Sequence, residues 1–366
     1  MVRHRSLQQL KQWLRSRRSQ RSAGFTLLEL LVSLVIGGII TASLLSLVVD
    51  LTGVNQRDAA RSETQRDMQL AMNYITQDLR EAVFVYDGEC LAGAGNINSA
   101  ADFATSCPGL INYIPASMST PPSTPVLAFW RVDRLPETLL TQCRDAAQNS
   151  PNPNVANNPL NQLISSGVPC VSGKSYTLVV YAFVNNTAGG IWQGKGRIVR
   201  YQLAQFNAAG TRNNSWVDPL QDPGASFRQW PFRLINGVPT APPAPYVRPG
   251  DTPDTLVDFV DNRVPFTTSA QADAACPTPS RITPLSTTAP FPSFYACVRG
   301  NTRAALVANQ SGELGVNQEV LLVLQGNAAG KAGIPVTATG DSAVSSRLAP
   351  LQTRVLTRGI VDKAPK

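Results

Sequence analysis

The chain has 366 residues, of which 43% are hydrophobic and only 15% are charged. This composition excludes a disordered tail protein and is sufficient for a sizeable core. The formal net charge of +8 first suggests nucleic-acid binding, but residues 1–24 hold seven of the 32 bases and no acid. Beyond them, 25 bases face 24 acids, so the rest of the chain is nearly neutral. The only histidine, His4, lies in this basic head, and losing the head would exclude His-dependent catalysis and His-ligated metals.

Residues 25–49 form an apolar run of 25 residues that is interrupted by one charge, Glu29. As a helix rising about 1.5 Å per residue, this run is long enough to cross the roughly 30 Å hydrocarbon layer of a bilayer. It is too long for the apolar part of a secretory signal, and no small-residue cleavage pattern follows it. We therefore expect a retained anchor, with the basic head in the cytoplasm and everything beyond Asp50 on the opposite side.

Glu29 needs an explanation, because a carboxylate at the centre of a membrane helix costs about 2.5–3.5 kcal/mol. One explanation is hydration near the interface. The other rests on the string Gly24-Phe25-Thr26-Leu27-Leu28-Glu29, which follows a basic leader and precedes the apolar run. This string resembles the class III prepilin signal of type IV pilins and type II secretion pseudopilins.

The resemblance implies that a prepilin peptidase cuts between Gly24 and Phe25 and that the new amino terminus, Phe25, is methylated. Glu29 is then the acid that this family retains in the mature chain. A cationic amine at Phe25 inside an apolar bundle needs a counter-charge. Glu29 of a neighbouring subunit supplies it and sets the axial register of a fibre. The implied partners are other pilins or pseudopilins, the peptidase and an inner-membrane assembly platform.

Two glycines, Gly37 and Gly38, lie in the middle of the apolar run, where each costs about 1 kcal/mol relative to alanine. They indicate either close packing of helices or a soft point at which the helix bends during assembly. The sequence leaves both readings open.

Beyond the apolar run, residues 50–83 predict the continuation of the helix. Met68, Met72, Ile75 and Leu79 recur at helical spacing over a polar background, and the pattern extends to Ala82 and Val83. From about Phe84 the pattern changes to short β-branched and aromatic runs, which predict strands at residues 126–132, 176–184, 191–206, 305–307, 319–324 and 354–360. The expected fold is therefore α+β, a long amino-terminal helix packed on a mainly antiparallel sheet.

Between these runs lie polar stretches rich in proline, which predict long surface loops at residues 115–125, 151–159, 238–250 and 277–292. Residues 185–190, Asn-Asn-Thr-Ala-Gly-Gly, predict a hairpin connection between two strands. We expect four parts: a cleaved leader (1–24), a transmembrane and assembly helix (25–49), the extracytoplasmic half of the helix (50–83) and a β-rich globular domain (84–366).

Six cysteines all lie on the expected extracytoplasmic side, where an oxidising compartment favours disulfides. Six cysteines allow fifteen pairings. Proximity in sequence favours the pairs Cys90 with Cys107, Cys143 with Cys170, and Cys276 with Cys297. The absence of a Cys-x-x-Cys motif disfavours a zinc or redox site.

The sequence shows no phosphate-binding glycine motif, so we expect no cofactor. Without a histidine beyond the head, no nucleophile and base can be named, so we expect no enzymatic activity. Four acids in a proline-flanked segment offer oxygen ligands to calcium, although their spacing is not that of an EF-hand and a solvated loop or short helix is favoured. These acids are Asp251, Asp254, Asp258 and Asp261.

The expected function is structural, that of a minor pseudopilin or minor pilin in the inner membrane, with its globular domain in the periplasm or in a pseudopilus. Its large mature chain of 342 residues and its Pro/Asn-rich loops are similar to the cyanobacterial pseudopilins of hormogonium polysaccharide secretion. The alternative is a single-span anchored receptor or glycan-binding protein that keeps its basic head. A third reading, an anchored hydrolase, lacks a nucleophile and base that the sequence identifies.

Overall fold

The computed structural model describes residues 26–149, 158–187, 189–220, 226–242, 248–250, 253–263, 266, 268–285, 293–300, 302–303, 307, 317–336 and 346–359. The chain divides into two compact units, residues 1–55 and residues 56–366. We call them the amino-terminal unit and the globular unit and describe each by itself. Helix α2, Leu27–Arg80, contributes its first half to one unit and its second half to the other.

Helix α2 ends at Arg80, so the expected helix over residues 50–83 is three residues too long. The next four residues form strand β1, Ala82–Val85, and all four side chains are buried. A helix would bury only one face of this Ala-Val-Phe-Val sequence. As a strand between two apolar layers it buries both faces, and tertiary packing therefore overrides the helical pattern.

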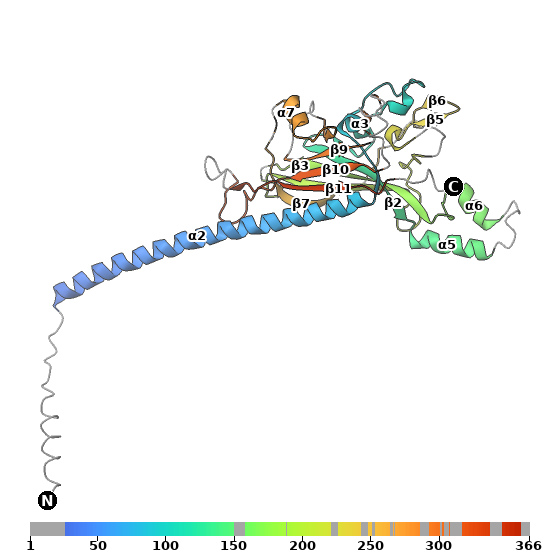
Figure 1. The fold of residues 1–366 in the computed structure, drawn as a ribbon. Helices are drawn as coiled ribbons and strands as arrows, with labels where there is room; N and C mark the ends of the chain where they lie inside the picture. The colour runs from blue at the N-terminus through green and yellow to red at the C-terminus, as the bar shows by residue number, and fades with distance from the viewer. Residues whose placement is uncertain are drawn as a thin grey trace, which may run out of the picture. The chain divides into compact units, whose positions relative to one another are not determined.

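The larger sheet of the globular unit has five antiparallel strands in the order β1-β2-β3-β4-β7. Its long strands are β2 (Ser123–Arg134), β3 (Lys174–Asn185) and β4 (Gly196–Ala204), and β7 (Asp254–Val260) forms one edge. The second sheet has the order β11-β10-β9-β8 and is also antiparallel. Its strands are β8 (Arg281–Thr283), β9 (Phe294–Arg299), β10 (Glu319–Leu324) and β11 (Leu351–Leu356), and β9, β10 and β11 lie side by side in Figure 1.

Short elements fill the connections. Strands β5 (Arg233–Ile235) and β6 (Val238–Thr240) form a separate hairpin. The short helices are α3 (Gly88–Ala92), α4 (Ala116–Ser119), α5 (Glu137–Gln148), α6 (Pro159–Ser165) and α7 (Ser269–Ala274), and there are 3₁₀ turns at Phe103–Thr105, Leu110–Asn112 and Phe227–Gln229. The fold class expected from the sequence, α+β with antiparallel sheets, is confirmed.

The main core lies where helix α2 meets the two sheets. Its apolar stripe (Met68, Met72, Ile75 and Leu79) packs with inward side chains of β2, β3 and β4 and with those of β9, β10 and β11. The opposite face of the large sheet is also buried, under α3, α4 and the turns that carry Trp216 and Trp230. Both faces of the central strands are therefore apolar, which is why their sequences are continuous apolar runs rather than alternating ones.

The side chain of Gln318 bridges the two sheets. The Val85 amide of β1 donates to Gln318 Oε1 at 2.7 Å, and Gln318 Nε2 donates to the Val85 carbonyl at 2.9 Å. Gln318 is buried, so both hydrogen bonds are shielded from water. The amide side chain thereby takes the place of a strand neighbour for β1 and joins the two sheets at this end.

The expected strands over residues 126–132, 176–184 and 319–324 lie within β2, β3 and β10. The run 191–206 is a strand only from Gly196 to Ala204. The expected hairpin connection is present, since β3 and β4 are consecutive antiparallel neighbours, but it extends beyond residue 190 to Lys195. The last strand is β11, Leu351–Leu356, and it starts three residues before the expected Arg354. The expected strand at 305–307 falls mostly outside the described residues, as does the loop at 151–159.

The six cysteines form the disulfides Cys90–Cys107, Cys143–Cys170 and Cys276–Cys297. These are the pairs that sequence proximity favours. The second of them closes the insertion between β2 and β3, where α5 and α6 lie next to each other around a small apolar cluster that includes Leu139 and Phe206. Because this cluster is separate from the main core, the disulfide carries a large share of its stability.

Replacing Cys143 and Cys170 together with serine is expected to lower the free energy of unfolding by about 3 kcal/mol, because the loop they close is no longer constrained in the unfolded chain. The loss should appear first as rapid hydrogen exchange in α5 and α6, measured by mass spectrometry on the full chain in detergent. The matched control replaces Asn161 with serine in α6. Equal exchange in the double variant and the wild type would contradict this role.

Candidate functional site

The start of helix α2 places the acid that the sequence singles out. Thr26 precedes the helix, and its Oγ1 accepts a hydrogen bond from the Glu29 amide at 3.3 Å. Its carbonyl accepts from the amides of Glu29 and Leu30. Thr26 therefore caps the helix, and the Thr-x-x-Glu spacing is that of a capping box. Glu29 lies in the first turn, where the positive end of the helix dipole favours a carboxylate. Gly24 and Phe25 lie outside the described residues.

The first half of α2 presents apolar side chains on every side. Each residue from Thr26 to Thr52 is exposed in this chain, including Leu28, Leu34 and Ile39 at 71%, 76% and 62%. The segment is long and apolar enough to cross a membrane. A helix that is hydrophobic all round and has no cover of its own requires an apolar environment. Lipid or other apolar helices can supply it.

Three hydroxyls of this segment are satisfied within the helix. Ser33, Thr41 and Ser43 donate to carbonyls three or four residues earlier, at 2.8–3.0 Å. These three donors are therefore paired without help from an apolar surrounding. Glu29 differs from them, because no ion pair of its carboxylate occurs within the described part of the chain.

The two glycines of the span have free space around them. A Cβ added at Gly37 or Gly38 would meet no atom within 4 Å outside the local helix. Packing within the described chain thus gives no reason for glycine at either position. The two readings from the sequence, close contact with another helix and a soft point, both remain predictions.

The second half of α2 is attached to the sheet through one buried carboxylate. Asp78 accepts hydrogen bonds from Arg131 of β2 at 2.6 Å and from Arg200 of β4 at 2.8 Å. The hydroxyl of Tyr181, on the strand β3 between them, also donates to Asp78. Asp78 is only 8% exposed. Three neighbouring strands therefore converge on one helical side chain.

Burial raises the pKa of the Tyr181 hydroxyl far above its ordinary value, and the adjacent Asp78 charge raises it further. The hydroxyl consequently stays protonated and remains a donor to the carboxylate. Burial by itself lowers the pKa of Arg200, but the hydrogen bond and charge of Asp78 outweigh this effect, so that the net shift is upward. The cluster is a paired, charge-assisted network rather than a group prepared for proton transfer.

The pattern of residues in the sequence does not predict this network. One signal was available, since Asp78 lies three residues after Ile75 and immediately before Leu79, on the apolar stripe of α2. An acid on a stripe that packs against a sheet requires a basic partner. The sequence does not show which of the 32 bases provides it, because Arg131 and Arg200 are 53 and 122 residues away.

Two of the acids considered as calcium ligands lie in strand β7. Asp254 is exposed at the start of β7, Asp258 lies within that strand, and Asp261 follows it. Asp251 lies outside the described residues. Among the residues that the structure does describe, no three His, Cys, Asp or Glu side chains are grouped closely enough to hold a metal ion.

Two of these carboxylates hold neighbouring segments in place. Asp258 accepts from Asn186 Nδ2 at 2.8 Å and from the Gly194 amide at 3.1 Å. Asp261 is 1% exposed and accepts from Asn327 Nδ2 at 2.7 Å. These donors occupy lone pairs that a cation would need. The arrangement favours structural roles for both acids.

Comparison with known proteins finds one match. Residues 19–45 match the family model of the prokaryotic N-terminal methylation motif, the signal of type IV pilins and pseudopilins. No curated protein and no solved structure matches the chain. The matched residues include Gly24, Phe25 and Glu29 and more than half of the exposed apolar segment. The proteins that carry this motif are structural rather than enzymatic. The methylation motif and the apolar helix at the amino terminus together indicate a membrane-anchored protein with a type IV pilin-like amino terminus.

Proposed function

We propose that this protein is a minor pseudopilin or minor pilin, a structural subunit of a type IV pilus-like or type II secretion-like fibre. The observation that carries the proposal is the coincidence of the methylation motif with an apolar helix that is exposed on all sides from Thr26 to Thr52. Such a helix can lie in the inner membrane before assembly and can pack among other apolar helices afterwards.

Processing and assembly would then use three positions. Prepilin peptidase cuts between Gly24 and Phe25, Phe25 becomes the methylated amino terminus, and Glu29 pairs with the amino group of a neighbouring subunit. The capping of the helix by Thr26 supports this arrangement, because it keeps Glu29 in the first turn and close to the new amino terminus. The partners are other pilins or pseudopilins, the peptidase and the assembly platform.

The size of the mature chain supports a minor position in the fibre. Its 342 residues include the disulfide-closed insertion between β2 and β3 and long connections around both sheets. A repeating shaft subunit has to pack every copy against its neighbours, whereas a subunit at the tip tolerates such additions. Its large globular domain, which we place in the periplasm or in the pseudopilus, and its composition also agree with a role in polysaccharide secretion and motility.

Processing provides the direct test of the proposal. In cells that possess a prepilin peptidase, the mature chain is expected to begin at Phe25 and to carry a methyl group on its amino nitrogen. Replacing Gly24 with valine should abolish cleavage, because a branched side chain then occupies the position before the cut. Amino-terminal sequencing and intact-mass measurement distinguish the two forms.

The matched control for this test replaces Ser22 with alanine, two residues earlier in the leader, and should be processed like the wild type. A wild-type chain that retains Met1 in these cells would contradict the proposal. That result would instead favour a single-span anchored receptor or glycan-binding protein that keeps its basic head in the cytoplasm.

A further inference from the structure

Residues 327–336 form a loop between β10 and β11 that reaches helix α2, and we call it the strap. Its base is fixed to the globular unit. The Asn327 amide donates to the Phe259 carbonyl at 2.7 Å, its side chain donates to the buried Asp261, and the Ala328 amide donates to the Ser346 carbonyl at 2.8 Å. The strap is thus held rigidly where it leaves the sheet.

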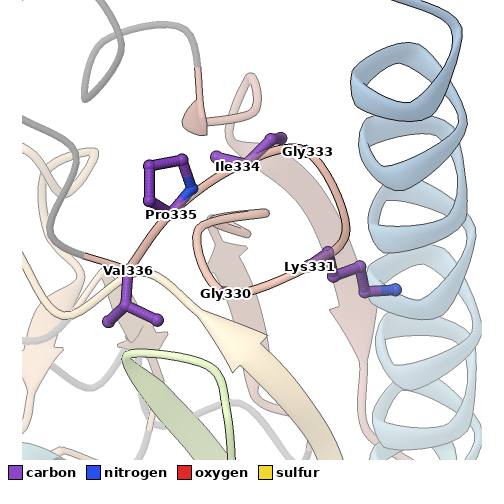
Figure 2. Close-up of a pocket in the computed structure, with 6 residues that line it drawn as sticks. All are labelled: Gly330, Lys331, Gly333, Ile334, Pro335 and Val336. Atoms are coloured by element: carbon purple, nitrogen blue, oxygen red, sulfur yellow. The ribbon is translucent and has the colours of Figure 1, made fainter. Parts of the chain in front are cut away.

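The strap contacts α2 through one lysine. Lys331 Nζ lies 3.3 Å from Glu63 Oε2 and 3.3 Å from Asp67 Oδ2, two carboxylates on successive turns of the helix. The lysine side chain is only 10% exposed, and its ammonium lies 4.9 Å from the centre of the Phe259 ring. Figure 2 shows Lys331 pointing toward the helix while Pro335 and Val336 lie farther from it. A nearly buried charge that two acids share holds its partners more firmly than an exposed ion pair does.

Two further contacts lie nearer the start of the globular unit. Arg57 Nε donates to the Gly333 carbonyl at 3.1 Å. Ala60 is 4% exposed and packs in a small apolar cluster with alanines of the strap and with Ile334. The side chains of Ala60, Ala328 and Ala329 are short, so the strap lies close to the helix backbone at this point.

The strap contacts three turns of α2. The side chains of α2 that contact it are Arg57, Ala60, Glu63 and Asp67, whereas the apolar main core begins at Met68. At about 1.5 Å per residue, residues 56–67 are roughly 18 Å long. Opening the strap would therefore remove these four contacts and leave the apolar contacts from Met68 onward in place.

The strap also has the features of a segment that can move. Gly330 and Gly333, on either side of Lys331, have φ values of 102° and 79°, which favour glycine. Six residues between Gly330 and Val336 line an open hollow of about 450 Å³ (Figure 2). The tip is thus bounded by two glycines with positive φ and has space beside it, while its base is fixed.

We propose that the strap reversibly holds residues 56–67 of α2 against the sheets and that the Lys331 ion pairs keep it in place. When these ion pairs break, three turns of α2 detach without any change in the main core, and the free part of the helix lengthens by the same amount. This inference concerns the free chain and goes beyond the proposed function.

Hydrogen exchange measured by mass spectrometry on the full chain in detergent tests whether the strap holds α2. Replacing Lys331 with methionine keeps the aliphatic stem over Phe259 and removes the charge. We expect exchange in residues 56–67 to become about tenfold faster, because hydrogen bonds to charged groups are lost. Exchange in residues 72–80 and in β3 should stay unchanged. The matched control replaces Lys174, an exposed lysine of β3, with methionine and should leave both regions at the wild-type rate.

A second variant joins the strap to α2 by a disulfide. A Cβ at Gly333 would lie 3.3 Å from Gln56 Cβ, close to the mean separation of about 3.8 Å in disulfides. Replacing both residues with cysteine should slow exchange in residues 56–67 below the wild-type rate and cancel the effect of Lys331→Met. Cysteine at 333 is strained by its positive φ, so the methionine variant carries the test by itself if this variant misfolds. Unchanged exchange in Lys331→Met, or a uniform increase from residue 56 to residue 80, would overturn the proposal.

Discussion

Replacing Asp78 with asparagine is expected to lower the free energy of unfolding by about 3–5 kcal/mol, the cost of leaving buried charges without their partner. Arg200 loses its counter-charge and Arg131 keeps only its ion pair with Asp133, and both arginines are largely buried, at 12% and 16% side-chain exposure. Asparagine has nearly the same shape, so the loss reflects charge rather than volume. Denaturant unfolding of the full chain in detergent, followed by tryptophan fluorescence, measures the change.

The control for Asp78 is an acid whose ion pairs are exposed. Glu137 pairs with Arg144 at 2.7 Å, but both side chains are more than half exposed, so Glu137→Gln should cost no more than about 1 kcal/mol. A triple variant, Asp78→Asn with Arg131→Met and Arg200→Met, is expected to recover part of the lost stability, because neither arginine then stays buried without Asp78. The recovery is partial, because Asp133, 28% exposed, loses its ion pair with Arg131. A loss of less than about 1 kcal/mol in Asp78→Asn would show that the network does not hold the helix.

Replacing Glu29 with glutamine is expected to leave membrane insertion intact and to reduce incorporation into the fibre by at least about tenfold. An amine left unpaired among apolar helices costs several kcal/mol, and about 1.4 kcal/mol is already a factor of ten. Glutamine keeps the length and the capping position of the side chain. The measurement is the ratio of sheared-fibre protein to membrane-bound protein, quantified by immunoblotting.

Asp58 provides the matched control for Glu29, since it is an exposed acid on the same helix, beyond the apolar segment. Asp58→Asn should assemble at the wild-type level. Normal incorporation of Glu29→Gln would show that the charge of Glu29 does not set the axial register of the fibre. Helix capping would then be left as the role of this acid. Loss of the protein from the membrane fraction would instead assign Glu29 a role in insertion.

The elements that the sequence predicts well are those whose signal is local. The span, the apolar stripe from Met68 to Leu79 and the strand at 319–324 each carry their own periodicity or composition, and the structure contains all three. Strand β1 and helix α5 are different. The first is too short and too close to a helix to be separated from it, and the second lies in an insertion whose small core is formed with residues far away in the chain.

The features of the candidate site also differ in whether consecutive residues or distant residues form them. The proposed cleavage and methylation at Gly24 and Phe25 rest on consecutive residues, and a linear motif over residues 19–45 is sufficient to predict them. The attachment of the helix depends on Asp78 meeting arginines of two separate strands and on Lys331 meeting two turns of α2. Ion pairs of this kind leave no periodic trace, because their partners are set by strand order and register.

The sequence by itself therefore determined the amino-terminal signal, the apolar helix, the α+β class and the near-neutral charge beyond residue 24. The tertiary structure decided where the helix ends, how the sheets are ordered and which charges secure the helix to them. The physical reason is that hydrophobic patterns repeat along the chain, whereas a buried charge selects its partner through space.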